Sequence, residues 1–368
     1  MAKLIEITGK ALSGEWGADD ETGDGIPVLR TTNFTNEGVV NYNDVVTRTI
    51  TKKHIDEKFL RKGDIIIEKS GGSDKFPVGR VIYFDGEENT YLFNNFTGLL
   101  RVRNQEVWYP RYVFYSLFAN YQRGGTRAFE NKTTGLHNLK TDDYVSRCEV
   151  AEIDKEEQIS ICEKLDKLYA IIKSREQELH LLDELIKARF VELFGDININ
   201  DKNWDCEPLG DLCTIVRGGS PRPIEQFLGG DVPWIKIGDA TDGDNIYLSS
   251  TKEHIIQDGV KKSRLVKSGS LIFANCGVSL GFARIITFDG CIHDGWLAME
   301  DIDERLDKVF LLQSLNQMTE HFRAIAPAGT QPNLNTAIMK VYKQVIPPIE
   351  LQRDFIKFVE QVDKSKVA

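Results

Sequence analysis

The segment GRVIYFDG at residues 79–86 returns as ARIITFDG at residues 283–290, and this pair indicates how the chain is organised. Three further pairs occur in the same order: residues 51–55 with 251–255, 60–66 with 266–272, and 138–141 with 333–336. Four ordered pairs at a spacing of roughly 200 residues predict a tandem of two like domains rather than a short-period solenoid.

Each copy has the pattern of a mixed α/β domain. Residues 64–68 and 270–274 are apolar runs that follow glycine-containing turns, and an Asp-Gly pair closes the next predicted strand in both copies. Residues 109–121 and 307–323 have the pattern of helices.

Between the copies the apolar period changes to alternating steps of four and three, which is a heptad pattern. It runs through Ile161, Leu165, Leu168, Ile172, Arg175, Leu179, Leu182, Ile186, Arg189 and Leu193. No Pro or Gly interrupts it from Asp154 until Gly195, where a helix terminator belongs. The pattern favours a long spacer helix, and the alternative is an amphipathic core helix within a globular domain. Leu351, Phe355, Phe358 and Val362 repeat the spacing at the end of the second copy.

Composition places the chain among globular proteins with packed cores, since it is 41% hydrophobic and 28% charged. Six scattered cysteines form no Cys-x-x-Cys pair, and no signal-peptide or membrane-length apolar run occurs. We therefore expect a cytoplasmic protein with no metal site and no membrane contact. The net charge is −10, and residues 151–205 hold 8 Lys+Arg against 14 Asp+Glu. The two copies are thus nearly neutral, and their affinity for phosphates is expected to be modest without a partner.

An ordered motif set appears in the second copy. Residues 217–223 (RGGSPRP) form a glycine turn, residues 230–236 (GDVPWIK) a Gly-x-x-Pro-Trp strand, and residues 347–352 (PPIELQ) a lead-in to the last helix. With residues 329–334 (GTQPNL), this set resembles the specificity (S) subunits of type I restriction–modification enzymes. The first copy is less similar, because Val28 replaces the tryptophan, Glu157-Gln158 lack the prolines, and residues 8–14 match the glycine turn only loosely.

The resemblance covers essentially the whole chain and implies an α+β fold. Two similar mixed α/β target-recognition domains are separated by long antiparallel (coiled-coil) spacer helices. The implied parts are a first recognition domain at residues 1–150, a long spacer helix at 151–197, a second recognition domain at 198–346, and a short, apparently truncated second spacer helix at 347–368. Each domain is expected to read half of a bipartite double-stranded DNA target, and the helices to set the gap.

Base readout needs Arg, Lys, Asn, Gln, Ser or Thr on loops that enter a groove. The candidate DNA-binding residues lie on corresponding loops of the two copies: Arg30, Lys69, Ser70, Lys75, Arg80, Arg127, Lys132, Thr133, Arg217, Ser220, Arg222, Lys236, Asn275, Ser279, Arg284, Thr330 and Gln331. Gly218 and Gly219 either let backbone amides approach a phosphate or only satisfy turn geometry. Arg80 and Arg284 are expected at matching positions, with a shared structural role or a phosphate contact.

The chain lacks the motifs of the partner enzymes. Pro347-Pro348 is not preceded by Asn or Asp as a methyltransferase centre requires, and no phosphate-binding loop or Pro-Asp nuclease dipeptide occurs. We expect no catalytic residue and no cofactor in this chain. The resemblance implies methyltransferase (M) subunits that use S-adenosylmethionine and a restriction (R) subunit that uses ATP and Mg. The alternative is a non-catalytic coiled-coil scaffold that dimerises and carries two protein-binding domains.

The last helix is shorter than the first, so part of the heptad seam is expected to lie without an intrachain partner. The expected spacer and partner-interface residues are Leu165, Leu168, Ile172, Leu179, Leu182, Ile186, Leu193, Phe355, Phe358 and Val362. Exposure of four aliphatic residues from Leu179 to Leu193 would be unfavourable. A homodimer, a methyltransferase partner or the chain's own domains would have to cover them, and we favour another subunit.

Overall fold

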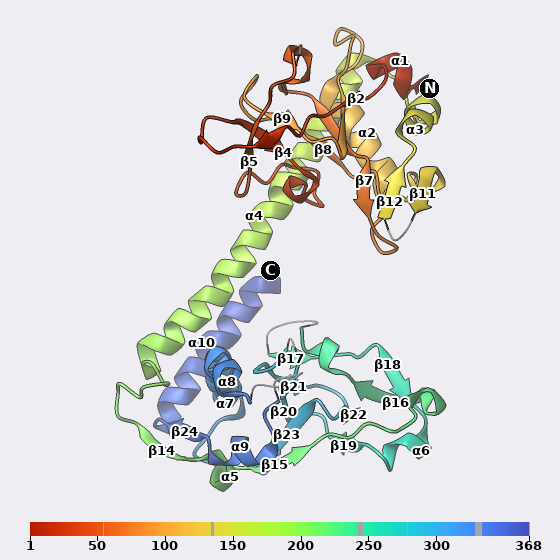
Figure 1. Ribbon diagram of the computed structural model, residues 1–368. Coiled ribbons are helices and arrows are strands. Elements are labelled where there is room, and N and C mark those ends of the chain that lie inside the picture. Colours follow the sequence, from red (N-terminus) through yellow and green to blue (C-terminus); the bar gives the residue numbers. More distant parts are fainter. Residues whose placement is uncertain (54, 134–135, 242–245, 278, 328–332, 368) are drawn as a thin grey trace. The chain divides into compact units, whose positions relative to one another are not determined.

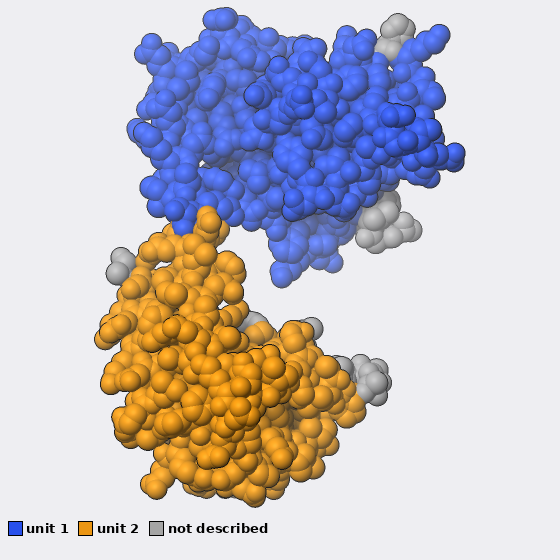
Figure 2. Space-filling model, turned by 90° about the vertical axis from the view of Figure 1, so that its left-hand side faces the viewer, with its two compact units in different colours: residues 1–174 blue, residues 175–368 orange. Residues whose placement is uncertain are grey.

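Helix α4, Lys155–Phe194, is the longest element of the computed structural model, with 40 residues. Its first turn carries Glu156 and Glu157, which favour a helix N-terminus, and no Pro or Gly interrupts it. It ends at Gly195, whose φ of 76° is a conformation that glycine adopts without strain. The structure describes residues 1–367 apart from 54, 134–135, 242–245, 278 and 328–332. The chain divides into two compact units, Met1–Ser174 and Arg175–Ala368 (Figure 2).

Within its described residues, the first unit contains three sheets of three or four strands, and helix α2 packs against the one that contains β6, β8 and β10 (Figure 1). The strand orders are β2-β10-β6-β8, β3-β5-β4-β9 and β11-β12-β7, and β1 pairs with β13. The strands are β1 (Ala2–Lys3), β2 (Leu12–Ser13), β3 (Ala18–Asp19), β4 (Ile26–Leu29), β5 (Val46–Thr49), β6 (Ile65–Glu68), β7 (Ser70–Gly72), β8 (Val81–Tyr83), β9 (Leu92–Phe93), β10 (Thr97–Leu100), β11 (Glu130–Thr133), β12 (Leu136–Leu139) and β13 (Glu149–Val150). The helices before α4 are α1 (Leu4–Thr8), α2 (Pro110–Gln122) and α3 (Thr141–Arg147).

The second unit repeats the two larger sheets, and one of them has five strands in place of four among the described residues. The strand orders are β15-β23-β20-β21-β17 and β18-β16-β22-β19, and β14 pairs with β24. The strands are β14 (Asp205–Pro208), β15 (Thr214–Arg217), β16 (Leu228–Ile235), β17 (Tyr247–Leu248), β18 (Glu253–Ile255), β19 (Arg264–Val266), β20 (Leu271–Ala274), β21 (Ala283–Ile286), β22 (Gly290–Ile292), β23 (Trp296–Glu300) and β24 (Lys343–Ile346). The helices are α5 (Leu209–Leu212), α6 (Gln257–Val260), α7 (Lys308–Gln317), α8 (Thr319–Ile325), α9 (Thr336–Val341) and α10 (Ile349–Val367). The expected α+β fold with two similar domains and a long helix is confirmed.

Hydrogen bonds show which residues of the two units correspond. The amide of Leu139 donates to the carbonyl of Lys69 at 2.8 Å, and that of Leu334 donates to Asn275 at 2.8 Å. The amides of Gly63 and Gly269 likewise donate to Phe84 and Ile286, at 3.0 and 2.7 Å. The structure thus confirms two of the predicted repeat pairs, 60–66 with 266–272 and 138–141 with 333–336.

The register of the other two predicted pairs, 79–86 with 283–290 and 51–55 with 251–255, is wrong. Arg80 does not correspond to Arg284. The amide of Glu68 donates to the carbonyl of Arg80, whereas the amide of the matching residue Ala274 donates to the carbonyl of Phe282, both at 2.8 Å. Arg80 therefore corresponds to Phe282, two residues before Arg284. Residues 51–55 do not correspond to residues 251–255 either. β5 (Val46–Thr49) pairs with β4 in the same way as β18 (Glu253–Ile255) pairs with β16, so β5 is the counterpart of β18.

A buried glutamine joins each domain to its helix in the same way. The side-chain oxygen of Gln158 accepts the amide of Tyr109, and that of Gln352 accepts the amide of Asp307, both at 2.8 Å. The Nε2 group of each donates to two backbone carbonyls, which for Gln352 are those of Arg305 and Pro347. Both glutamines are fully buried, so the repeated Glu-x-Gln lead-in is a structural clamp.

We expect Gln352→Ala to lower the free energy of unfolding of the second unit by about 3 kcal/mol, because it removes the hydrogen bonds of three backbone groups, one of them buried and two part-buried. The matched control is Gln361→Ala, an exposed position on the same helix, which should change the free energy by less than about 0.5 kcal/mol. Urea denaturation of the parent and the two variants measures the difference. Equal losses in both variants would contradict the clamp.

Helix α10 packs antiparallel against the part of α4 that belongs to the second unit (Figure 1). Phe194 meets Phe355 with ring centroids 5.5 Å apart, and Asp183 meets Lys366 at 2.8 Å. The two arginines of the heptad pattern also face α10. Arg175 donates to the last carbonyls of α10 at 3.4 Å, and the Arg189 guanidinium lies 5.8 Å from the ring of Phe358. Both arginines of the heptad pattern therefore lie on the face of α4 that contacts α10.

The prediction that the seam beyond Leu179 lacks an intrachain partner is wrong. Ile186 is 5% exposed, and Leu182 and Leu193 pack against the same core. Phe355 and Val362, which were predicted to lie at a partner interface, are instead buried in that core, and Phe358 packs against it. Leu179 is half-buried.

The core is supplied largely by α7, α8 and the sheet of the second unit, so a short α10 suffices to cover this part of α4. Exposure falls instead on Leu165, Leu168 and Ile172, at 36%, 56% and 55%.

Candidate nucleic-acid interface

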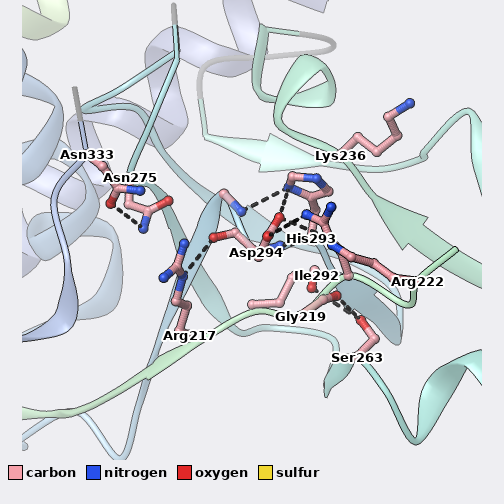
Figure 3. A network of polar contacts seen from close by, with 12 residues as sticks. Arg217, Gly219, Arg222, Lys236, Ser263, Asn275, Ile292, His293, Asp294 and Asn333 are labelled. Atoms are coloured by element: carbon pink, nitrogen blue, oxygen red, sulfur yellow. Dashed lines mark hydrogen bonds and ion pairs between the residues drawn. The ribbon is translucent and has the colours of Figure 1, made fainter. Parts of the chain in front are cut away.

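In the second unit, the glycine turn after β15 surrounds Asp294, which follows β22 (Figure 3). Arg217 donates through Nε to the Asp294 carbonyl at 3.0 Å, and Ser220 donates to the carboxylate at 2.8 Å. Arg222 lies 3.6 Å from the other carboxylate oxygen, with its side chain 79% exposed. Three residues predicted from sequence thus meet at one acidic residue that the sequence analysis did not identify.

The two glycines of this turn serve the fold. A Cβ on Gly218 would lie 2.1 Å from the carbonyl oxygen of His293, which rules out any larger residue. The amides of Gly218 and Gly219 donate to the carbonyls of Trp296 and Ile292, at 2.9 and 3.0 Å. Because both amides are used within the domain, the turn-geometry interpretation holds and the phosphate interpretation does not. Gly14 is the counterpart in the first unit, since a Cβ there would lie 2.1 Å from the Asn94 carbonyl.

His293 and Asp294 set the charge of this site. Burial lowers the pKa of His293, and Lys236, Arg222 and Arg217 lower it further against the opposing effect of Asp294. Burial raises the pKa of Asp294, but the hydrogen bond from Ser220 and the nearby cations outweigh it, so the net shift is downward. At neutral pH the pair is therefore a neutral imidazole beside a carboxylate.

Beside this pair lies a cavity of about 800 Å³. Its lining includes Trp234 from β16, Lys236, which follows that strand, and His293. Lys236 is paired with Glu253 of β18 at 2.6 Å. The volume lies within the range of small-molecule and nucleotide pockets, about 300–1,000 Å³. The cavity gives the second unit a concave surface at the predicted recognition loops.

In the first unit, the corresponding loops hold cations near the sheet β11-β12-β7. Lys69 precedes β7 and donates to Ser13 at 3.1 Å, and Ser70 is the first residue of β7. Lys132 and Thr133 lie on β11. Arg127 donates to the Asp74 carbonyl at 3.4 Å, which holds the loop that carries Lys75. These predicted residues belong to one strand-and-loop group.

A second cavity, of about 420 Å³, opens at this loop. Its described lining contains three cationic residues, Lys75, Arg123 and Arg127, and no carboxylate. Tyr121, Gln122 and Asn36 complete its polar wall. Such a group can neutralise a phosphate, as positively charged DNA-binding loops do. The sequence analysis missed Arg123, which lies at the end of α2, because it is adjacent to no repeat motif.

Several predicted DNA-binding residues are not available at the surface. Asn275, Ser279 and Arg284 are buried, at 0%, 2% and 4% exposure. Arg80 donates to the carbonyls of Thr31 and Phe34, and its ion pair with Glu68 lies inside the domain. Arg30, by contrast, stays partly exposed at the surface, where it is paired with Asp44 at 3.1 Å. Arg80 and Arg284 thus have structural positions, though not a shared one, while Thr330 and Gln331 lie outside the described residues.

Corresponding positions of the two sites carry different side chains. β4 and β16 pair in parallel with β9 and β22, which aligns Val28 with Trp234. Arg30 then corresponds to Lys236, and each backbone amide is bound by the residue three positions later, Asn33 or Asp239. Asn94 corresponds to His293, because the amide of Asn94 donates to the carbonyl of Leu29 at 2.9 Å and the amide of His293 donates to that of Ile235 at 3.0 Å. One backbone frame thus presents two different sets of side chains.

Comparison with known proteins is consistent with this geometry. Residues 201–368 match the family model described as type I restriction modification DNA specificity domain. This match covers less than half of the chain, and it shows that the second unit is similar to type I restriction–modification specificity domains. Among curated relatives, it is 23% identical over 185 residues to the MjaIX specificity subunit of Methanocaldococcus jannaschii, covering 49% of this chain and 43% of the relative. It is 26% identical over 166 residues to the HindI specificity subunit of Haemophilus influenzae, covering 44% and 36%. The matches thus span less than half the length of these relatives.

Solved structures of specificity subunits share the fold. The S subunit from M. genitalium superposes with a TM-score of 0.57 at 17% identity, covering 99% of this chain and 89% of that one. A chain from a study of complex assembly and conformational transition of the type I R-M system gives a TM-score of 0.55 at 13% identity, covering 100% and 90%. Within the described residues, no helix has both the length and the apolar character that a membrane crossing requires.

Proposed function

We propose that this chain is the non-catalytic specificity subunit of a type I restriction–modification complex and that each unit reads one half of a bipartite DNA target. The observation that carries this proposal is the repeated frame with unlike side chains, such as Val28 against Trp234 and Asn94 against His293. Similar frames suit the similar grooves of a duplex, and different side chains suit two different half-sequences.

The reactions would belong to partner subunits. Methyltransferase subunits would bring S-adenosylmethionine, and the restriction subunit would bring ATP and Mg, because this sequence has none of the corresponding motifs. The exposed residues Leu165, Leu168, Ile171 and Ile172 of α4 form an apolar strip that suits contact with a methyltransferase or with a second copy. The same strip would serve a non-catalytic scaffold, so DNA binding is the property that separates the two functions.

The test is salt-dependent DNA binding by the chain together with its methyltransferase subunit. Arg217→Ala with Arg222→Ala should reduce the slope of log K against log salt by about 2, if both arginines neutralise phosphates. Lys267→Ala with Lys261→Ala is the control, since both lysines lie in the same unit outside the described lining of the cavity and outside the Asp294 contacts. Absence of sequence-specific binding by the parent complex would favour the scaffold.

A further inference from the structure

The cavity of the second unit has the walls of a site for a flat ring. Trp234, which is 3% exposed, and His293 pack against each other with ring centroids 5.6 Å apart, so a ligand ring would lie beside this pair and not between the two rings. Pro221, Ile224 and Leu228 add apolar surface. Leu228 is 40% exposed although it is a large aliphatic side chain. Apolar and aromatic walls with a few polar groups are typical of pockets that bury a heteroaromatic ligand.

The charges of this cavity do not favour a phosphate. Arg222 and Lys236 line it, but so do Glu225 and Glu253, and Lys236 is already paired with Glu253 at 2.6 Å. Two cations matched by two carboxylates give little net attraction for an anion. The cavity of the first unit is different, because its described lining has three cationic residues and no carboxylate. A neutral ligand therefore suits the second unit better.

The polar groups match the edge of a nucleobase. The Nδ1 atom of His293 lies 2.9 Å from the amide of Gly295 and 3.0 Å from a carboxylate oxygen of Asp294, so Nε2 is the ring nitrogen left for a ligand. Glu225 is exposed at the same cavity and supplies carboxylate acceptors. Carboxylates accept from the exocyclic amino groups of adenine and cytosine, and the Nε2 atom of His293 is a second polar group for the edge of such a base.

We propose that this cavity receives one nucleobase that has left the stack of the bound duplex. The inference rests on the proposed DNA-binding function and extends it, because a base inside the duplex cannot enter a concave pocket. Withdrawing a base costs a few kcal/mol, and the cost is least when the base is already mispaired. The first unit is not expected to do the same, because Val28 and Asn94 replace Trp234 and His293 and Trp16 stands in the glycine turn in place of Ser220.

The experiment scans the DNA target with single mispairs and with 2-aminopurine, using the chain with and without its methyltransferase subunit. At one position in the half-sequence read by the second unit, a mispair should tighten binding about tenfold, and 2-aminopurine fluorescence should rise. Leu228→Trp, which places a bulky ring at the wall of the cavity and narrows it, should abolish both signals. Leu265→Trp is the matched control, since Leu265 is 43% exposed in the same unit and is not part of the described lining.

The outcomes separate the inference from the proposed function. If the duplex is bound but no mispair in that half tightens binding, or if the signals survive Leu228→Trp, the cavity does not take a base. A signal that persists in Leu228→Trp and requires the methyltransferase would then arise in that subunit. If the parent complex binds no specific DNA, the proposed function fails, and the inference fails with it.

Discussion

Ile186→Glu is expected to unfold the second unit and not merely to separate subunits. Ile186 is 5% exposed and belongs to a core that includes Phe190, Phe194, Phe310 and Phe355. Removing a buried isoleucine costs about 2–5 kcal/mol, and a carboxylate without a partner adds to this cost. The total is comparable to the stability of a typical domain, about 5–15 kcal/mol.

Leu185→Glu is the matched control, because Leu185 is the preceding residue of α4 and is 46% exposed. It should change the free energy of unfolding by less than about 1 kcal/mol. Circular dichroism melts and hydrogen exchange of residues 198–346 measure both variants. If Ile186→Glu stays folded but loses a subunit contact, the residue faces a partner and not the core.

Inserting seven residues between Lys173 and Ser174 is expected to abolish methylation at the original target and to create a new one. Seven residues keep the heptad phase and lengthen α4 by about 10 Å, which equals roughly three base pairs. Residues 171–174 are exposed, and the contacts of Arg175 with α10 lie beyond the insertion.

The motif methylated by the variant complex, determined by sequencing, should keep both half-sequences and widen only the gap between them. Changed half-sequences would show that the insertion disturbs the recognition domains. An unchanged gap would show that α4 does not set the spacing of the target.

The sequence predicts the architecture well because the duplication and the heptad pattern are signals of periodicity. The helix α4 follows directly from the heptad pattern, whereas the hydrogen bonds of Gln158 and Gln352 emerge only from the structure. Register is harder to obtain, since a strand pair such as residues 80–84 and 284–288 can be aligned by similarity and still be two residues out of place. Backbone pairing decides it, and a single sequence does not contain that information.

The candidate site is predicted only in part, because residue type does not reveal burial. Arg217, Ser220, Arg222 and Lys236 do gather in one place, whereas Arg80 and Arg284 are arginines that the interior uses. Asp294 and His293 were missed because nothing in their sequence neighbourhood resembles a motif. Their counterparts Asn95 and Asn94 in the first unit are also polar, and a correct alignment of the repeats would have indicated the position.

The most direct test of the central claim is the sequence of the DNA that a methyltransferase complex containing this chain methylates. We predict two defined half-sequences separated by a gap of constant length and undefined sequence, with methylation lost when this chain is omitted. Exchanging residues 198–346 for the equivalent domain of another specificity subunit should change one half-sequence and leave the other as it was. A continuous motif, a gap of variable length, or methylation that persists without this chain would contradict the account.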